Sequence, residues 1–340
     1  MNDKHVLIVA EMSGNHNGCF DAAVEIIKAA KQSGADAIKL QTYTADTLTL
    51  DCHKPEFMTN PNGIWAGRTA YSLYQEASTP WDWHPELFRI AREEGLICFS
   101  SPFDKTAVDF LETLDNPIYK IASPEITDIP LIEYAAAKHK PMVISTGIAT
   151  EEDIRLALDA CHRVGNEDIT LLKCTTAYPT PLAECNLNAL PLYRETFGVK
   201  VGLSDHTMGD MAPMIATALG ATMIEKHFIV DRSKGGPDAS FSMNPDEFAQ
   251  MVHNIRLTEQ IMGEASLEPS PLCKAGRRDA RSLYVCEDMK AGDVITEKNV
   301  RSIRPNGGLH PKYLSELLGK HVNCDIENGT PFDFFMLEKQ

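Results

Sequence analysis

The sequence predicts an α/β protein built on a (β/α)8 TIM barrel, followed by a small C-terminal domain. Eight short runs rich in Val and Ile are separated by longer segments with the apolar spacing of helices. These units fill about 260 residues, close to the roughly 250 that such a barrel takes. After Met262 the pattern stops, and short stretches broken by turn signals follow.

The predicted strands are continuous apolar runs without polar alternation, as expected for parallel strands that are buried on both faces. In chain order they are 6–12, 37–42, 97–101, 118–123, 142–146, 169–175, 200–204 and 223–230. Helical segments are expected at 20–33, 106–114, 131–139, 151–164, 211–219 and 245–262. In the first of these, Ala23, Ile26, Ile27 and Ala30 occupy one helical face.

Residues 43–83, between the second and third strands, depart from the barrel pattern. They are too many for an ordinary βα loop, so we expect them to cover one end of the barrel. The segment carries five large rings, for which packing and sugar stacking are both open interpretations: Trp65, Trp81, Trp83, Tyr71 and Tyr74.

The domain boundaries follow from the change in composition. Residues 1–263 are predicted to form the barrel, and 264–277, with Pro269 and Pro271, a linker. Residues 278–340 are predicted to form a small domain of short strands, because Gly292-Asp293, Asn306-Gly307 and Asn328-Gly329 are turn signals.

Composition narrows the class of partner. The net charge of −16 argues against nucleic acid and anionic membranes. No run approaches the roughly 18 apolar residues of a membrane helix, and the apolar run at 6–10 is too short for a signal segment. Nine scattered cysteines without a CxxC pair predict reduced thiols and a cytoplasmic location.

Polar side chains cluster where seven of the eight predicted strands end. They are Glu11; Lys39 and Gln41; Lys120, Ser123 and Glu125; Ser145; Lys173 and Thr175; Ser204, Asp205 and His206; Glu225, Lys226 and His227. A barrel enzyme carries its reacting groups at this end. Lysine charge and serine hydroxyls meeting there suit a phosphorylated, carboxylated anion. The alternative is that Lys39 and Lys120 are rim residues paired with Glu11 or Glu125.

Two histidines on adjacent strands predict a metal site. His206 and His227 fall at matching depth near the barrel mouth, and such imidazole pairs suit a divalent first-row metal with open coordination positions. The alternative is that each is a hydrogen-bonded core residue. His16, in a glycine-rich loop, and His253, on the last barrel helix, are weaker candidates.

Eight motifs in order resemble the sialic acid synthase family. They are AEMSGNHNG at 10–18, IKLQT at 38–42, YKIASPE at 119–125, STG at 145–147, YPTP at 178–181, GLSDHT at 202–207, EKHF at 225–228 and GPDASFS at 236–242. RSLY at 281–284 and RSIRPNGGL at 301–309 resemble that family's antifreeze-like SAF domain. The resemblance covers nearly the whole chain.

The resemblance implies residue roles. Lys39, Lys120, Ser123, Ser145 and Ser204 would hold phosphoenolpyruvate, and His206 and His227 would bind Mn2+, with Mg2+ or Co2+ as alternatives. Glu11, Gln41, Glu125, Tyr178 and Asp238 would face the sugar or its reacting end, and Glu125, Glu11 and His227 would serve catalysis. Arg304 would reach the partner's site in a domain-swapped homodimer. The family has an asparagine where this chain has Thr176, which argues against a sialic acid substrate.

Within the family, residues 63–84 and GGPDASFS look most like synthases that make pseudaminic acid. The implied reaction joins phosphoenolpyruvate to 2,4-diacetamido-2,4,6-trideoxy-L-altrose. The nearest rivals are N-acetylneuraminate or legionaminate synthases with the same chemistry. Two more distant interpretations are a carbohydrate-binding protein that kept the barrel and a synthase of a shorter keto acid.

Overall fold

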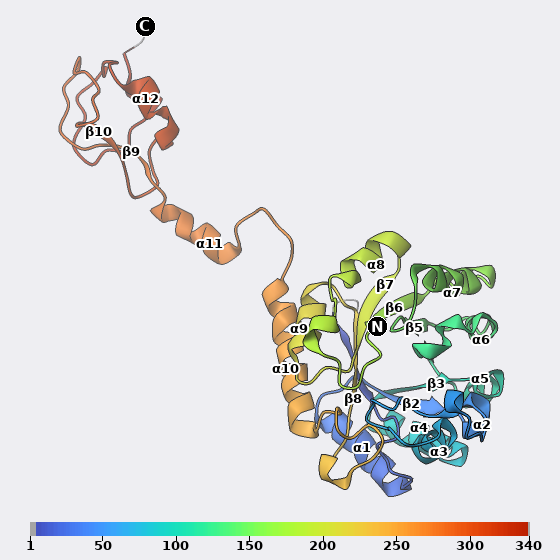
Figure 1. Ribbon diagram of the computed structural model, residues 1–340. Helices are drawn as coiled ribbons and strands as arrows, with labels where there is room; N and C mark the ends of the chain where they lie inside the picture. The colour runs from blue at the N-terminus through green and yellow to red at the C-terminus, as the bar shows by residue number, and fades with distance from the viewer. Residues whose placement is uncertain (1–4, 339–340) are drawn as a thin grey trace. The chain divides into compact units, whose positions relative to one another are not determined.

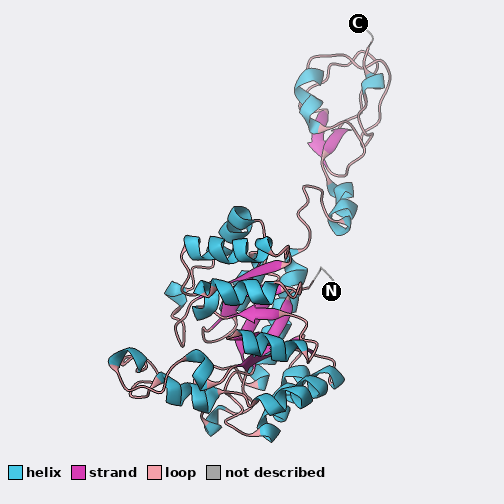
Figure 2. Ribbon diagram, turned by 90° about the vertical axis from the view of Figure 1, so that its right-hand side faces the viewer, coloured by secondary structure: helices cyan, strands magenta, loops and turns pink. Residues whose placement is uncertain are grey.

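The computed structural model describes residues 5–338, and the chain divides into two compact units between Gly263 and Glu264. The first unit is a closed barrel of eight parallel strands, with β1 hydrogen-bonded to β8 (Figures 1 and 2). The barrel prediction is confirmed. The strands are β1 Leu7–Glu11, β2 Ala37–Thr42, β3 Ile97–Pro102, β4 Tyr119–Ile121, β5 Met142–Ser145, β6 Ile169–Cys174, β7 Lys200–Asp205 and β8 Met223–His227.

Helices surround the strands (Figure 2). The principal ones are α1 Phe20–Gln32, α4 His84–Glu93, α5 Lys105–Glu112, α6 Ile129–Ala136, α7 Glu151–Arg163, α8 Ala189–Phe197, α9 Met211–Ala218 and α10 Pro245–Met262. Their starts follow local capping chemistry: Thr150 and Asp153 form a capping box at α7, and Asn244 and Glu247 form one at α10. Helices α4 and α8 were not among the predicted helical segments.

The insertion at 43–83 is structured. It contains α2 Ala45–Leu48, the 3₁₀ turn η1 Pro55–Phe57, α3 Ala70–Ala77 and the 3₁₀ turn η2 Trp81–Trp83. Helices α2 and α3 contact each other. The segment that connects β2 to α4 is therefore unusually long for a βα connection and carries its own short helices.

Two apolar layers stabilise the barrel. Between strands and helices lies a large buried cluster that includes Ile8, Ile38, Ile144 and Ile224. Inside the barrel a smaller cluster fills one end: Val9, Ala37, Phe99, Ile118, Val143, Leu172 and Met223. Since side chains alternate along a strand, the residues two positions later point to the same interior. Along each strand, this shift of two residues takes the side chains that line the barrel interior from apolar to polar.

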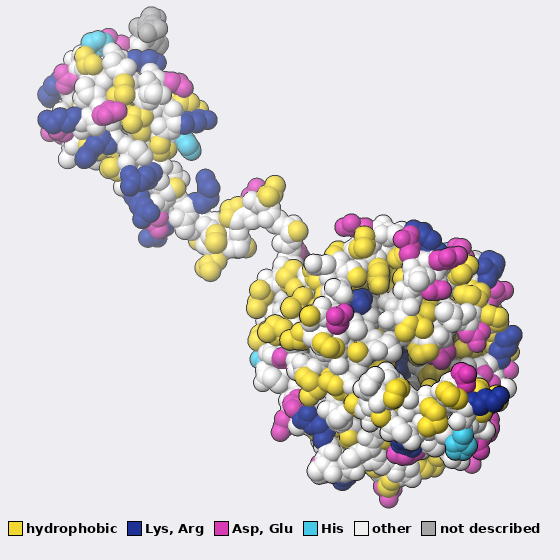
Figure 3. Space-filling view, in the orientation of Figure 1, with side chains coloured by type: hydrophobic (Ala, Val, Ile, Leu, Met, Phe, Trp, Pro, Cys, Tyr) yellow, Lys and Arg dark blue, Asp and Glu magenta, His cyan; other side chains and the backbone are white. Residues whose placement is uncertain are grey.

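The second unit is small and has its own core. Strands β9 Ser282–Val285 and β10 Val300–Ile303 pair antiparallel, and Leu283, Val285, Val300, Leu317 and Phe332 are buried together. The stretch predicted as a linker, 264–277, contains α11 Pro271–Ala275 and the first half of the 3₁₀ turn η6 Gly276–Asp279. Acidic and basic side chains are spread over the surface of both units (Figure 3). Among residues 5–338, no helix has the length and apolarity to cross a membrane.

Candidate active site

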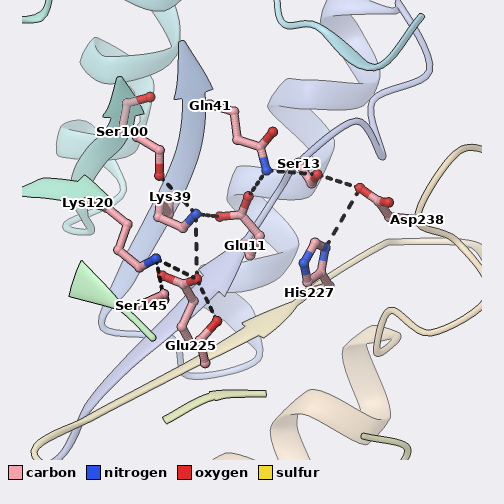
Figure 4. Close-up of polar contacts among 12 residues, drawn as sticks. Glu11, Ser13, Lys39, Gln41, Ser100, Lys120, Ser145, Glu225, His227 and Asp238 are labelled. Atoms are coloured by element: carbon pink, nitrogen blue, oxygen red, sulfur yellow. Dashed lines mark hydrogen bonds and ion pairs between the residues drawn. The ribbon is translucent and has the colours of Figure 1, made fainter. Parts of the chain in front are cut away.

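The polar end of the barrel interior gathers residues from all eight strands or the turns that follow them. Each apolar interior residue is followed, two positions on, by a polar or ionisable one: Val9 by Glu11, Ala37 by Lys39, Phe99 by Ser101, Ile118 by Lys120, Val143 by Ser145, Leu172 by Cys174 and Met223 by Glu225. Figure 4 shows the side chains of Glu11, Lys39, Lys120, Ser145 and Glu225 converging. The floor of the site is thus set by strand register.

Two buried lysines and two buried carboxylates form the floor. Lys39 Nζ lies 2.7 Å from Glu11 Oε2 and 3.6 Å from Glu225 Oε1, and Lys120 Nζ lies 3.8 Å from the same Glu225 oxygen. Lys120 also donates to Ser145 Oγ at 2.7 Å. The predicted pairing of Lys39 with Glu11 therefore exists, but inside the pocket and not on its rim.

The charges on this floor are shifted by burial and by one another. Burial raises the pKa of Glu11 to about 7, although Lys39 acts to lower it. Burial also raises the pKa of Glu225, but Lys120 and Lys39 outweigh it and hold that pKa below its ordinary value. Burial lowers the pKa of Lys120. The floor therefore places the ionised carboxylate of Glu225 between two lysines, and Glu11 is close to taking up a proton near neutral pH.

Ser101 and Glu225 are site residues that the sequence analysis did not assign to binding or catalysis. Lys39 Nζ donates to Ser101 Oγ at 3.3 Å, and Ser204 Oγ donates to Glu225 Oε1 at 3.3 Å. Strand β3 was the one predicted strand without an assigned polar end. Ser101 lies at the end of that strand, in the sequence SSP at 100–102, but a serine at this place has no distinctive spacing.

A second group of polar atoms, separate from the lysine floor, surrounds Gly147 where β4, β5 and β6 end. Gly147 N–H donates to Ser123 Oγ at 3.0 Å. A Cβ on Gly147 would lie 2.2 Å from Thr176 Oγ1 and 2.7 Å from Ser123 Oγ. Thr176 Oγ1 is buried without a hydrogen-bond partner among the described residues. Hydroxyls and an N–H packed this closely around a glycine suit the approach of an anion.

Glu125 belongs to the short turn η3, Pro124–Thr127, that directly follows β4. Its Oε2 is buried and makes no hydrogen bond to another described residue. Burial raises the pKa of this carboxyl to about 7, against an opposing effect of Lys120. A carboxyl with such a pKa can both give and take a proton near neutrality.

The two predicted metal ligands face one common space. The rings of His206 and His227 lie 5.3 Å apart between centroids. His206 Nδ1 lies 3.0 Å from the Thr175 carbonyl, which assigns the proton to Nδ1 and leaves Nε2 its lone pair. His227 Nδ1 is buried with no hydrogen-bond partner in residues 5–338. Burial lowers the pKa of His227, which keeps the imidazole neutral as a ligand must be.

A buried ion pair supports the turn that carries His206. Lys226 Nζ contacts Asp205 Oδ2 and donates to the Thr207 carbonyl at 2.6 Å. Asp205 Oδ1 in turn accepts from Thr207 N–H at 2.9 Å. Strands β7 and β8 are thereby joined on both sides of His206, so this pair fixes the backbone from which one imidazole projects.

One wall of the site is polar and another is aromatic. Gln41 Nε2 donates to Glu11 Oε1 at 2.8 Å and to Ser13 Oγ at 3.1 Å, and Ser13 donates to Asp238 (Figure 4). The aromatic wall is formed by Tyr178, which packs on His206 with ring centroids 4.4 Å apart and on Phe241 with ring centroids 5.1 Å apart. Burial raises the pKa of Tyr178, so its hydroxyl stays neutral.

The remaining predicted residues lie apart. His16 is buried and bonds Thr79 through Nε2, and His253 is exposed on α10. Arg304 is exposed directly after β10, in the second unit. Its contact with a partner's site stays a prediction.

Comparison with known proteins gives family matches along the chain. The NeuB family matches residues 26–266, and the SAF domain matches 280–338. A pseudaminic acid synthase of Campylobacter jejuni subsp. jejuni is 46% identical over 96% of this chain and 95% of that protein. The pseudaminic acid synthase of Helicobacter pylori is 46% identical over 98% of both chains.

Proteins named for other sugars are more distant. The N,N'-diacetyllegionaminic acid synthase of Legionella pneumophila is 35% identical over 95% of this chain and 92% of that protein. A crystal structure of an N-acetylneuraminic acid synthetase from Leptospira borgpetersenii, in complex with citrate, has a TM-score of 0.71 at 29% identity. It covers 80% of this chain and 90% of that chain.

Proposed function

The chain belongs to the NeuB family and carries a SAF domain, and we propose that it is a pseudaminic acid synthase. It condenses phosphoenolpyruvate with 2,4-diacetamido-2,4,6-trideoxy-L-altrose to give pseudaminic acid and phosphate. The observation that carries the proposal is the convergence of Lys39, Lys120 and Glu225 beside the facing imidazoles of His206 and His227. The identity of 46% to pseudaminic acid synthases, against 35% to a legionaminic acid synthase, supports this sugar.

The lysine floor would bind phosphoenolpyruvate. Within residues 5–338, Lys39 and Lys120 form ion pairs with the carboxylates of Glu11 and Glu225. Ser123 and Ser145 accept hydrogen bonds from Gly147 and Lys120, so their O–H groups can donate to a ligand, and Ser204 would do so by giving up its bond to Glu225. The two lysines lie on either side of Glu225. A ligand that carries both a phosphate and a carboxylate can place one anionic group near each lysine, which a ligand with a single negative charge cannot do. The lysines then stabilise the phosphate as it leaves.

The donor set at His206 and His227 fits a divalent ion. Imidazole nitrogens are ligands that Mn2+, Co2+ or similar ions accept, and His227 Nδ1 is buried without a hydrogen bond, 3.9 Å from Asp238 Oδ2. Within residues 5–338, the two imidazoles are not part of a larger group of His, Cys, Asp or Glu side chains that could hold a metal ion. When bound, the metal polarises the aldehyde oxygen of the open-chain sugar as a Lewis acid.

In the proposed reaction, the C2–C3 π electrons of phosphoenolpyruvate form a bond to the aldehyde carbon, and the aldehyde π pair moves to its oxygen, which takes up a proton. Positive charge builds at C2, and water adds there and gives up a proton. The C2–O bond to phosphate then breaks, the new C2 hydroxyl loses its proton, and the keto group and phosphate are formed. Glu125 would accept the proton of the attacking water, because its pKa of about 7 leaves a basic carboxylate available at neutral pH. Glu11, Gln41 and Asp238 would hold sugar hydroxyls along the polar wall.

Assembly and location complete the proposal. Arg304 would reach the sugar in the partner's barrel, which makes a domain-swapped homodimer the working form. All nine cysteines are described, and none forms a disulfide. This matches an enzyme that works in the reducing cytoplasm, where phosphoenolpyruvate is available.

The test is phosphate release from phosphoenolpyruvate with a panel of sugars, followed by mass spectrometry of the product. Release with the diacetamido-trideoxy-altrose, and at least tenfold less with N-acetylmannosamine, is expected. Chelator should abolish release and Mn2+ restore it. If none of the sugars in the panel gives phosphate release, the chain is better explained as a carbohydrate-binding protein. Lys39→Met should stop turnover, whereas Lys200→Met should not, since Lys200 is an exposed lysine paired with Asp168 at the start of β7, remote from the strand ends.

A further inference from the structure

The insertion holds one tryptophan in place by a closed loop. Met58 and Thr69 form an isolated antiparallel bridge, and Thr59 N–H donates to the Arg68 carbonyl at 3.0 Å. Inside the loop, Thr59 Oγ1 donates to the carbonyl of Trp65 at 2.6 Å. The backbone of Trp65 is therefore fixed by the loop's own hydrogen bonds, and its indole can serve as a rigid surface.

The indole of Trp65 reaches the site from far along the chain. Its Nε1 donates to the carbonyl of Pro237 at 2.7 Å, next to Asp238. Its ring packs on Tyr178, with centroids 5.4 Å apart, and Tyr178 packs on His206. Trp65 thus extends the aromatic wall that begins at His206.

The other tryptophans of the insertion have different contacts. Trp81 stacks on Phe110 of α5, with centroids 4.9 Å apart, and Trp83 meets Phe20 edge to face. Both pack the insertion against the outer helices. The two interpretations of these rings, packing and sugar contact, therefore apply to different tryptophans. Trp81 and Trp83 pack, and Trp65 faces the site.

The chemistry of the Trp65 indole disfavours a hydroxyl beside it. Indole has a single hydrogen-bonding atom, and in Trp65 the Pro237 carbonyl already uses it. What Trp65 offers to a ligand is an apolar face. A hydroxyl held against that face loses hydrogen bonds to water without replacement, whereas a methyl group gains dispersion contacts.

The reach of the substrate fits this position. With its aldehyde at the His206–His227 pair, an open-chain hexose extends five carbon–carbon bonds of about 1.5 Å each, or roughly 6 Å, to C6. The ring centroids from His206 to Tyr178 and from Tyr178 to Trp65 are 4.4 Å and 5.4 Å apart, so the indole is no farther from the His206 ring than these two steps together. A sugar aldehyde stands in front of the imidazole and not at its centre, so a chain of this length that runs along Tyr178 brings C6 toward the indole.

We infer that Trp65 is a specificity-determining residue, which selects a sugar with a methyl group at C6 over one with a 6-hydroxyl by closing the distal end of the pocket with an apolar face. The inference rests on the proposed function, because it assumes that the sugar aldehyde lies at the two histidines.

The experiment compares kcat/KM for two sugars, the 6-deoxy substrate and its 6-hydroxy analogue. The wild-type protein should prefer the 6-deoxy sugar by about 100-fold, the order of magnitude at which an apolar pocket rejects an added hydroxyl. Trp65→Ala should lower that ratio about tenfold, and Trp65→Gln, which offers a hydrogen-bonding partner, should lower it further. Trp81→Phe is the matched control from the same insertion and should leave the ratio unchanged.

The outcomes separate the inference from the proposed function. If wild-type protein releases phosphate with neither sugar, the proposed function fails. If it turns over both sugars equally, or if the two Trp65 variants lower both kcat/KM values by one factor, the function stands and the inference is wrong. An analogue without the 4-acetamido group is a further control. A Trp65 effect confined to that analogue would place the acetamido group, and not C6, against the indole and overturn the inference.

Discussion

Replacing Glu125 with Gln should stabilise the protein while it removes activity. The buried carboxyl has its pKa raised from 4.5 to about 7, chiefly by burial. A folded-state pKa above the unfolded value means that folding favours the protonated form. Stability from this group is therefore fully present below about pH 4.5 and is lost as pH rises through about 7.

The size of the effect follows from the two pKa values. Each pH unit between them corresponds to about 1.4 kcal/mol. The free energy of unfolding of Glu125→Gln should therefore match that of the wild type near pH 4.5 and exceed it by about 3 kcal/mol above pH 8. Gln keeps the shape of the neutral acid and does not ionise.

The assay is urea unfolding at a series of pH values, followed by tryptophan fluorescence. All three tryptophans lie in the barrel unit, so the signal reports on the unit that contains Glu125. Glu152→Gln, at an exposed position on α7, is the control and should change stability by less than about 0.5 kcal/mol at any pH. A Glu125→Gln difference that does not vary with pH would refute the argument from burial.

The same variant tests the mechanism. Glu125→Gln should abolish turnover while phosphoenolpyruvate still binds, and wild-type kcat should fall about tenfold per pH unit below pH 7 because the basic form of Glu125 is lost. Near-normal turnover of the variant would exclude Glu125 from proton transfer.

Three further predictions concern the rest of the site. Gly147→Ala should raise the KM for phosphoenolpyruvate more than tenfold, because its Cβ would strike Thr176 Oγ1 at 2.2 Å; Gly276→Ala has nothing within 4 Å and should change nothing. Steady-state kinetics of both variants checks this. Lys226→Met should cost about 3–5 kcal/mol of stability by leaving Asp205 buried and unpaired, measured by urea unfolding; a loss below 1 kcal/mol would contradict it. Mn2+ at 100 times its Kd should stabilise the folded chain by about 2.7 kcal/mol, seen as a higher Tm that chelator reverses, and an unchanged Tm would argue against a resident metal.

The repeating units of the barrel could be read from the sequence because each depends on local pattern. Buried parallel strands are continuous apolar runs, and β2 and α10 were predicted with the bounds that the structure has. Helices α4 and α8 were not predicted. His84 begins α4 directly after Trp83, and Pro191 lies inside α8. In both helices the rings and prolines weaken the helical pattern, and packing onto the barrel decides the outcome.

The site could be read in part for the same reason. Lys39, Lys120, His206 and His227 stand at strand ends, where the fold itself directs residues to the mouth. Ser101 and Glu225 stand there as well, but their importance comes from what they touch. A serine or glutamate beside a strand end has no distinctive spacing, so no local signal separates it from an ordinary rim residue.

Eight apolar runs, most of them followed by polar or ionisable residues, are a property of the chain's own pattern, and the ends of parallel barrel strands meet at one mouth. The sequence alone therefore determined that lysines, carboxylates and imidazoles share a pocket. Only the tertiary structure decided that Glu225 lies between both lysines and that Trp65 meets Tyr178 and Pro237. Those contacts join residues more than a hundred positions apart, and their distances depend on how separate elements pack, which no periodicity within one segment encodes.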